Sequence, residues 1–131
     1  MNMRPRGIDW FRRSVNDPHP PDRGHIKVSQ YYPPEKSWIR SEVWWFDVFS
    51  KDVERPSPDH IHFLCQKLVS SDDFYHLKVP KSVLHDAVRK GCVEVTPRSI
   101  IRLHLSARSM DRFLDIRAKG PYRLDISRFL Q

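Results

Sequence analysis

The chain has 131 residues, of which 39% are hydrophobic and 30% are charged, and its formal net charge is +7. This size and composition predict one soluble globular domain, and no apolar run approaches the ~20 residues that a membrane-spanning helix requires. The N-terminus lacks the apolar segment of a secretory signal, so we expect a cytoplasmic protein without a membrane partner. Only four glycines occur and no Gly-rich phosphate-binding loop is present, so we expect no nucleotide cofactor.

The basic charge is concentrated at the two ends of the sequence. Basic side chains outnumber acidic ones by 8 to 4 in residues 1–40 and by 11 to 5 in residues 81–131, whereas acidic ones lead by 7 to 4 in residues 41–80. This distribution favours an anionic partner for the two basic regions, with a merely solvated surface as the alternative. The two cysteines, Cys65 and Cys92, stand among apolar neighbours, and we expect buried free thiols, with one disulfide bridge as the alternative.

Residues 1–36 are expected to form a basic, proline-rich arm that is partly irregular. Six of the eleven prolines lie there, and proline removes a backbone donor and biases the preceding residue toward an extended conformation. One or two helical turns are expected around Trp10 and Phe11. These two residues, together with Tyr31 and Tyr32, are the candidate contacts to a protein partner or to a second copy of the chain, although docking on the chain's own domain is the commoner outcome.

Residues 37–131 are expected to form a single α+β domain with a mostly antiparallel sheet. The aromatic and β-branched run at 42–48 predicts a central strand that is covered on both faces. Residues 58–69 fit a helix or a strand, and a strand is slightly favoured because a polar turn and a second strand-like segment, 74–79, follow them. The clearest helix lies at 80–90, where an apolar stripe ends at two basic residues and a glycine.

Residues 100–128 predict a C-terminal three-stranded meander, because apolar and polar side chains alternate through them with two breaks. The outward face of this meander is basic, and guanidinium and ammonium groups bind phosphates. The candidate nucleic-acid-binding residues are Arg102, Arg108, Arg117, Lys119 and Arg123. Asp115 and Asp125 share the outward register, so cross-strand Arg–Asp pairs are the alternative to an open patch. The four tryptophans, which would stack bases, all lie within the first 45 residues of the chain.

These features lead to three hypotheses on function. The first is a small accessory protein that binds the phosphate backbone of DNA or RNA non-specifically through the basic sheet face, without catalysis. This hypothesis predicts an affinity that falls steeply as the salt concentration rises. The second is a protein-interaction or oligomerisation module that uses the aromatic residues of the N-terminal arm.

The third hypothesis is a histidine-dependent phosphodiesterase that uses His60, His62 or His104 as a general acid or base. His60 and His62 share one face if they lie on a strand, an arrangement that also suits a metal ion. No metal-binding motif accompanies the pair, so we expect surface or turn histidines and no metal site. An enzyme is therefore the less favoured class of protein.

Overall fold

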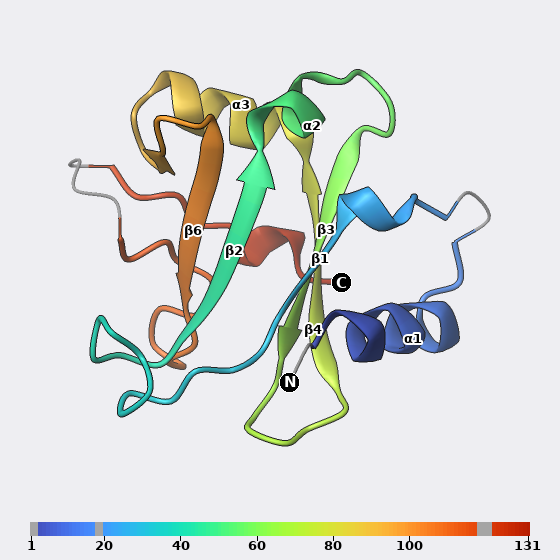
Figure 1. Ribbon diagram of the computed structural model, residues 1–131, viewed down its shortest axis with the longest axis vertical. Coiled ribbons are helices and arrows are strands. Elements are labelled where there is room, and N and C mark those ends of the chain that lie inside the picture. The colour runs from blue at the N-terminus through green and yellow to red at the C-terminus, as the bar shows by residue number, and fades with distance from the viewer. Residues whose placement is uncertain (1–2, 18–19, 118–121) are drawn as a thin grey trace.

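Two small sheets and three α-helices make up the computed structural model (Figure 1), which describes residues 3–17, 20–117 and 122–131. The first sheet has the strand order β1-β3-β4, in which β1 runs parallel to β3 and β4 runs antiparallel to it. Its strands are β1 (Ile26–Ser29), β3 (His60–Gln66) and β4 (Phe74–Pro80). Residues 58–69, which fitted a helix or a strand, thus contain a strand.

The second sheet has the order β2-β6-β5 and is antiparallel throughout. Its strands are β2 (Val43–Phe49), β6 (Ile100–Ser106) and β5 (Glu94–Val95). The predicted α+β class with mainly antiparallel pairing is confirmed. The prediction of a central, doubly covered strand at 42–48 is wrong, because β2 lies at the edge of its sheet and exposes alternate residues.

The inner faces of the two sheets share one hydrophobic core. Phe46 of β2 meets Phe63 of β3 across this core, with ring centroids 4.8 Å apart. Leu103 and Leu105 of β6 are fully buried in it, so the inward register predicted for this strand is confirmed. Burial of such side chains provides the main stabilisation of the fold, at roughly 1.5–3 kcal/mol for each large apolar residue.

The helices lie in two places in Figure 1: one is beside the first sheet, and the other two are together at one end of the strands. They are α1 (Arg4–Ser14), α2 (Ser50–Glu54) and α3 (Lys81–Arg89), with short 3-10 turns η1 (Arg23–His25) and η2 (Ser127–Phe129). The helix predicted at 80–90 is found as α3. None of the helices formed by the described residues is long and apolar enough to cross a bilayer.

α1 packs on the first sheet through a second, smaller apolar cluster. Ile8 and Phe11 of the helix are buried there against Leu64 and Phe74 of the strands. Gly7 allows the close approach of helix and sheet, because a Cβ atom at this position would lie 2.5 Å from a methyl carbon of Val28. The N-terminal region therefore contributes a helix and a strand to the packed structure.

The predicted proline-rich arm is not confirmed, because residues 4–14 form α1 and residues 26–29 pair with β3 in a sheet. Proline is tolerated in the first turn of a helix, which explains why Pro5 does not prevent α1. The division of the chain at residue 37 stays a prediction. Cys65 and Cys92 are buried and free, as expected.

The predicted C-terminal meander is not confirmed either. β6 provides a regular first strand, but beyond it the described residues pair only through isolated bridges: Leu105 with Asp115, Leu114 with Asp125, and Leu77 of β4 with Leu130. Phe113 has a positive φ of 70°, a conformation that interrupts an extended strand. The turn predicted at 119–121 lies outside the described residues.

Candidate nucleic-acid interface

The outward face of the second sheet carries a group of aromatic rings around a histidine. Antiparallel pairing of β2 with β6 places Trp45 opposite His104, and their ring centroids are 5.2 Å apart. Trp38, which precedes β2, meets the same histidine edge-on at 5.8 Å. Trp38 is 58% exposed and Trp45 is 36% exposed, whereas His104 is 1% exposed. Both tryptophans therefore present aromatic surface to solvent above a buried imidazole.

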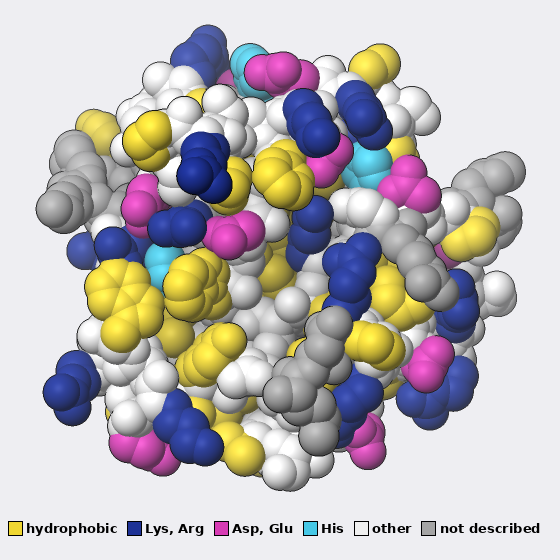
Figure 2. Space-filling view, viewed as in Figure 1, with side chains coloured by type: hydrophobic (Ala, Val, Ile, Leu, Met, Phe, Trp, Pro, Cys, Tyr) yellow, Lys and Arg dark blue, Asp and Glu magenta, His cyan; other side chains and the backbone are white. Residues whose placement is uncertain are grey.

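Two arginines extend this aromatic group into a mixed surface. The guanidinium of Arg117 lies over the indole of Trp38, 3.9 Å from the ring centroid, and that of Arg102 lies 5.9 Å from the ring centroid of Trp45. We call these four side chains, with His104, the Trp–Arg platform. Figure 2 shows hydrophobic, basic and acidic side chains with a histidine gathered over β2 and β6. Such a combination suits stacked rings and phosphates.

The arginines of the platform are partly neutralised by acidic neighbours. Arg102 pairs with Asp47 of β2 at 3.3 Å, and Arg117 pairs with Glu94 of β5 at 3.6 Å. The pairs are partly exposed, so each contributes only about 0–1 kcal/mol to stability. An anion can therefore replace the acidic partner at small cost, but the platform does not generate a strong positive field.

Asp115 lies buried beside the platform and accepts hydrogen bonds from the backbone of two platform residues. Its Oδ1 accepts hydrogen bonds from the backbone N–H groups of His104, at 3.3 Å, and Arg117, at 3.1 Å. Burial raises the pKa of Asp115 to about 6, and the two hydrogen bonds oppose this rise. Burial, followed by the charge of Arg117, lowers the pKa of His104, so this imidazole is neutral at pH 7.

Buried polar atoms without hydrogen-bond partners are concentrated at the platform. Nine such side-chain atoms occur among the described residues, and six of them belong to residues in or beside the platform. They are Glu94 Oε2, Arg102 Nε, both ring nitrogens of His104, Asp115 Oδ2 and Arg117 Nη1. Two of these atoms, Arg102 Nε and Glu94 Oε2, take part in the ion pairs of the platform without hydrogen-bond geometry. The other four have no hydrogen-bond partner among the described residues, and buried polar groups of this kind are usually satisfied by water or by a ligand.

The structure brings two of the predicted nucleic-acid-binding residues, Arg102 and Arg117, to the platform. Arg108 instead forms an ion pair with Asp111 in the turn after β6. Arg123 is exposed, and its charge acts on Asp115 beside the platform. Lys119 lies outside the described residues. The alternative of ion pairs with Asp115 and Asp125 is not found among the described residues, where the arginines pair with Asp47, Glu94 and Asp111. Figure 2 shows basic and acidic side chains interspersed over this face.

The aromatic residues predicted to contact a partner are used within the fold. Phe11 is buried, and the indole Nε1 of Trp10 donates a hydrogen bond to Asp73 at 2.9 Å. The hydroxyl of Tyr31 hydrogen-bonds the carboxylate of Glu42, and the backbone of Tyr32 bridges to Val43. Phe11 is therefore inaccessible to a partner in this structure, and the other three side chains are partly covered.

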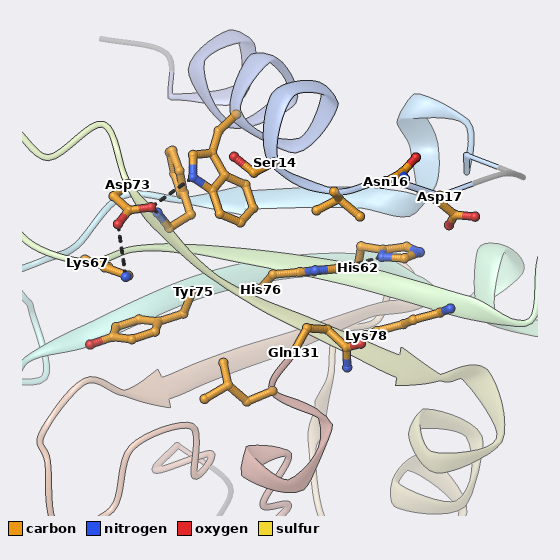
Figure 3. A pocket seen from close by; sticks show the side chains of 14 residues that line it. Ser14, Asn16, Asp17, His62, Lys67, Asp73, Tyr75, His76, Lys78 and Gln131 are labelled. Carbon is orange, nitrogen blue, oxygen red and sulfur yellow. Dashed lines mark hydrogen bonds and ion pairs between the residues drawn. The ribbon is translucent and has the colours of Figure 1, made fainter.

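A second candidate site is a cavity of about 740 Å³ between the end of α1, β4 and the C-terminal segment (Figure 3). Two buried histidines line it, His62 of β3 and His76 of β4, and their rings share a hydrogen bond of 2.8 Å between Nδ1 of the first and Nε2 of the second. Phe11 meets both rings edge-on, at 5.2 and 5.4 Å, which fixes their orientation.

Burial lowers the pKa of both cavity histidines to about 4. The neighbouring positive charge of Lys78 acts in the same direction at both rings. Both imidazoles are therefore neutral at pH 7, with one donor and one acceptor nitrogen each. His76 was not singled out in the sequence, because an isolated histidine within an alternating strand carries no motif.

The structure does not assemble the histidines of the phosphodiesterase hypothesis. His60 and His62 share a strand, whereas His104 lies in the other sheet. Within the described residues, no group of three or more His, Cys, Asp or Glu side chains is arranged to hold a metal ion. Comparison with protein-family models, with curated proteins and with solved structures gave no match. The function must therefore be argued from the two sites themselves.

Proposed function

We propose that the protein binds single-stranded DNA or RNA on the Trp–Arg platform, without catalysis. Bases stack on the exposed indoles of Trp38 and Trp45, and neighbouring phosphates contact Arg102 and Arg117. The observation that carries this proposal is the juxtaposition of two solvent-exposed indoles, each with a guanidinium against it, around the buried His104. Stacking of this kind contributes about 1–3 kcal/mol per base and tolerates every base.

The ion pairs change the expected electrostatics of binding. The sequence alone predicted a steep fall of affinity with salt, because five open basic side chains were expected. Among the described residues, two arginines flank the indoles, and both have acidic partners. We expect about two phosphate contacts and a slope of roughly −1.4 in the logarithm of the affinity against the logarithm of the salt concentration. Stacking on the tryptophans provides most of the remaining affinity.

The test is a titration of fluorescent oligothymidylate of about 12 nucleotides, a length that spans a small single-strand site, followed by anisotropy. Trp38→Ala should weaken binding about tenfold, because one stacked base is lost, and Trp38→Phe should retain most of the affinity. Phe49→Ala is the matched control, since Phe49 is an exposed aromatic residue of β2 with lysines over its ring. Equal affinities of wild type and Trp38→Ala would refute the proposal.

A further inference from the structure

The two cavity histidines form a linear hydrogen-bonded unit. Their ring planes are nearly parallel, 18° apart, and their centroids are 5.1 Å apart, although the bonded nitrogens are only 2.8 Å apart. Rings stacked face to face would have much closer centroids, so these rings lie end to end. This is the favourable geometry of an N–H···N hydrogen bond. A metal ion does not fit on the axis between the two bonded nitrogens, because they are only 2.8 Å apart and each metal–nitrogen bond is about 2.0–2.1 Å long.

The unit leaves one nitrogen of each ring for other partners. The outer nitrogens are Nε2 of His62 and Nδ1 of His76, and neither has a hydrogen bond to the described part of the chain. Because both rings are neutral, one outer nitrogen is an N–H donor and the other is an acceptor. These roles reverse, without a change in total charge, when the shared proton shifts across the hydrogen bond and the outer proton moves to the other outer nitrogen. The pair can therefore present a donor at either end.

Lys78 gives this cavity a positive character next to the pair. It follows His76 by two residues on the same face of β4 and stands opposite His62 in the register with β3. Lys78 forms no ion pair with the described residues, whereas Lys67, the other lysine of the cavity, is paired with Asp73 at 3.0 Å. Figure 3 shows Lys78 extending beside the histidines.

Two acidic side chains, Asp17 and Asp73, line the same cavity. Asp73 is paired with Lys67. The charge of Asp17 raises the pKa of both histidines, but the charge of Lys78 lowers it by more at each ring. The cavity therefore has a lysine without an ion pair to the described residues beside the two histidines, and its volume is that of an ordinary small-molecule site.

We propose that this cavity binds a small ligand through an oxyanion, a phosphate or a carboxylate group. The ammonium of Lys78 provides the charge, and the outer N–H of the His62–His76 pair donates a hydrogen bond to the oxyanion. Charge-assisted hydrogen bonds are the stronger kind, and the neutral imidazole donor adds direction to the attraction of the lysine. The site lies on the first sheet and is independent of the Trp–Arg platform.

The test is a titration of the whole protein with sodium phosphate, and separately with sodium acetate, at constant ionic strength. The ring ¹⁵N resonances of His62 and His76 report binding, because an anion fixes which outer nitrogen carries the proton. Saturable shifts with both anions indicate a general oxyanion site, and shifts with phosphate alone assign a phosphate ligand. The absence of any saturable shift beyond that seen with chloride overturns the proposal.

Lys78 provides the decisive variant, because it is a half-buried residue on a strand face and its replacement should leave the fold intact. Lys78→Met should weaken phosphate binding about tenfold or more, since a hydrogen bond to a charged group is lost. Lys78→Arg should restore much of it, and Lys90→Met at the end of α3 serves as the matched control. Unchanged affinity in Lys78→Met also overturns the proposal. Trp38→Ala should leave these shifts in place, which separates this site from the platform.

Discussion

The two sheets of this protein bury histidines in opposite ways. On the first sheet, His62 and His76 hydrogen-bond each other beneath α1. On the second sheet, both ring nitrogens of His104 lack partners among the described residues, and its ring is covered by two exposed indoles. The first arrangement shares one internal hydrogen bond and opens to a cavity, whereas the second has no hydrogen bond to its ring among the described residues and lies under a surface. The same residue type thus marks two different kinds of site.

This contrast separates the chemistry that each site can support. The cavity offers a donor and an acceptor from neutral rings beside one lysine, which suits a small polar ligand. The platform offers exposed aromatic area with guanidinium groups at its edge, which suits a chain of bases and phosphates. A ligand for one site should therefore not compete with a ligand for the other.

Acidification should have the largest effect on the difference between the two sheets, because it acts on the buried histidine pair of the first sheet. The pKa of His62 and of His76 falls from 6.5 in the unfolded chain to about 4 in the folded one. Their stabilising contribution is therefore complete above pH 6.5 and is lost as the pH falls toward 4, by an amount on the order of 3 kcal/mol for each ring. Asp115 acts in the opposite direction, because its raised pKa stabilises the fold only in acid and that contribution disappears as the pH rises through 6.

Urea unfolding of wild type and His76→Gln at pH 7.5 and pH 4.5 measures this effect. Wild type should lose free energy of unfolding on acidification, and the variant should be less stable at pH 7.5 but less sensitive to pH. His85→Gln is the control, since this histidine is exposed on α3. An identical pH dependence in wild type and His76→Gln would contradict the neutral, buried pair.

Gly7→Ala should displace α1, whose end lines the cavity, and should leave the platform unchanged. The added methyl group would lie 2.5 Å from a methyl carbon of Val28, so α1 must shift on the first sheet, at a cost of about 1–3 kcal/mol. We expect a lower free energy of unfolding and altered ring resonances of the two cavity histidines. Binding of oligothymidylate should be unchanged.

Gly24→Ala is the control for that variant, because its added methyl group meets only the end of the Asp22 side chain, at 3.3 Å. This glycine is exposed and lies in the short turn before β1. Equal free energies of unfolding for Gly7→Ala and Gly24→Ala would contradict the close packing of α1 on the first sheet. If Gly7→Ala weakened oligothymidylate binding as strongly as Trp38→Ala, the two sites would not be independent.

The smallest effect concerns the arginines of the platform. Arg117→Ala should weaken oligothymidylate binding about threefold to tenfold, and it should make the salt slope less negative by roughly 0.7 because one phosphate contact is lost. Arg89→Ala is the control for the loss of charge, since Arg89 is also an arginine in an ion pair, with Asp86 of α3 at 3.0 Å. A loss of affinity in Arg89→Ala equal to that in Arg117→Ala would mean that the arginines act only through net charge.

Local sequence patterns predicted the elements that have one apolar face and one polar face. The apolar stripe of α3 and the inward register of β6 each leave one face polar, and both were found. β3 was ambiguous because almost all of its residues are buried, by the core on one face and by α1 on the other. The sequence predicted only one or two helical turns where α1 is found. A proline in the first turn of a helix costs little stability, and the number of prolines in a segment does not show where in a helix each one lies.

The candidate sites required information that is absent from local patterns. Arg102 and Arg117 were found by charge, but Trp38 and Trp45 lie far from them in the sequence and join them only through the pairing of β2 with β6. The acidic partners of these arginines, Asp47 and Glu94, likewise come from neighbouring strands. Such long-range pairing is fixed by packing of the whole fold rather than by any motif.

The most direct measurement compares two oligomers of the same length and charge at one salt concentration. One is oligothymidylate, and the other is an abasic deoxyribose-phosphate chain that has the same phosphates but no bases. The platform predicts that the abasic chain binds about 30-fold more weakly or worse, because stacking on Trp38 and Trp45 is lost. Equal binding of the two oligomers would show that charge alone attracts nucleic acid and would contradict the proposed role of the indoles.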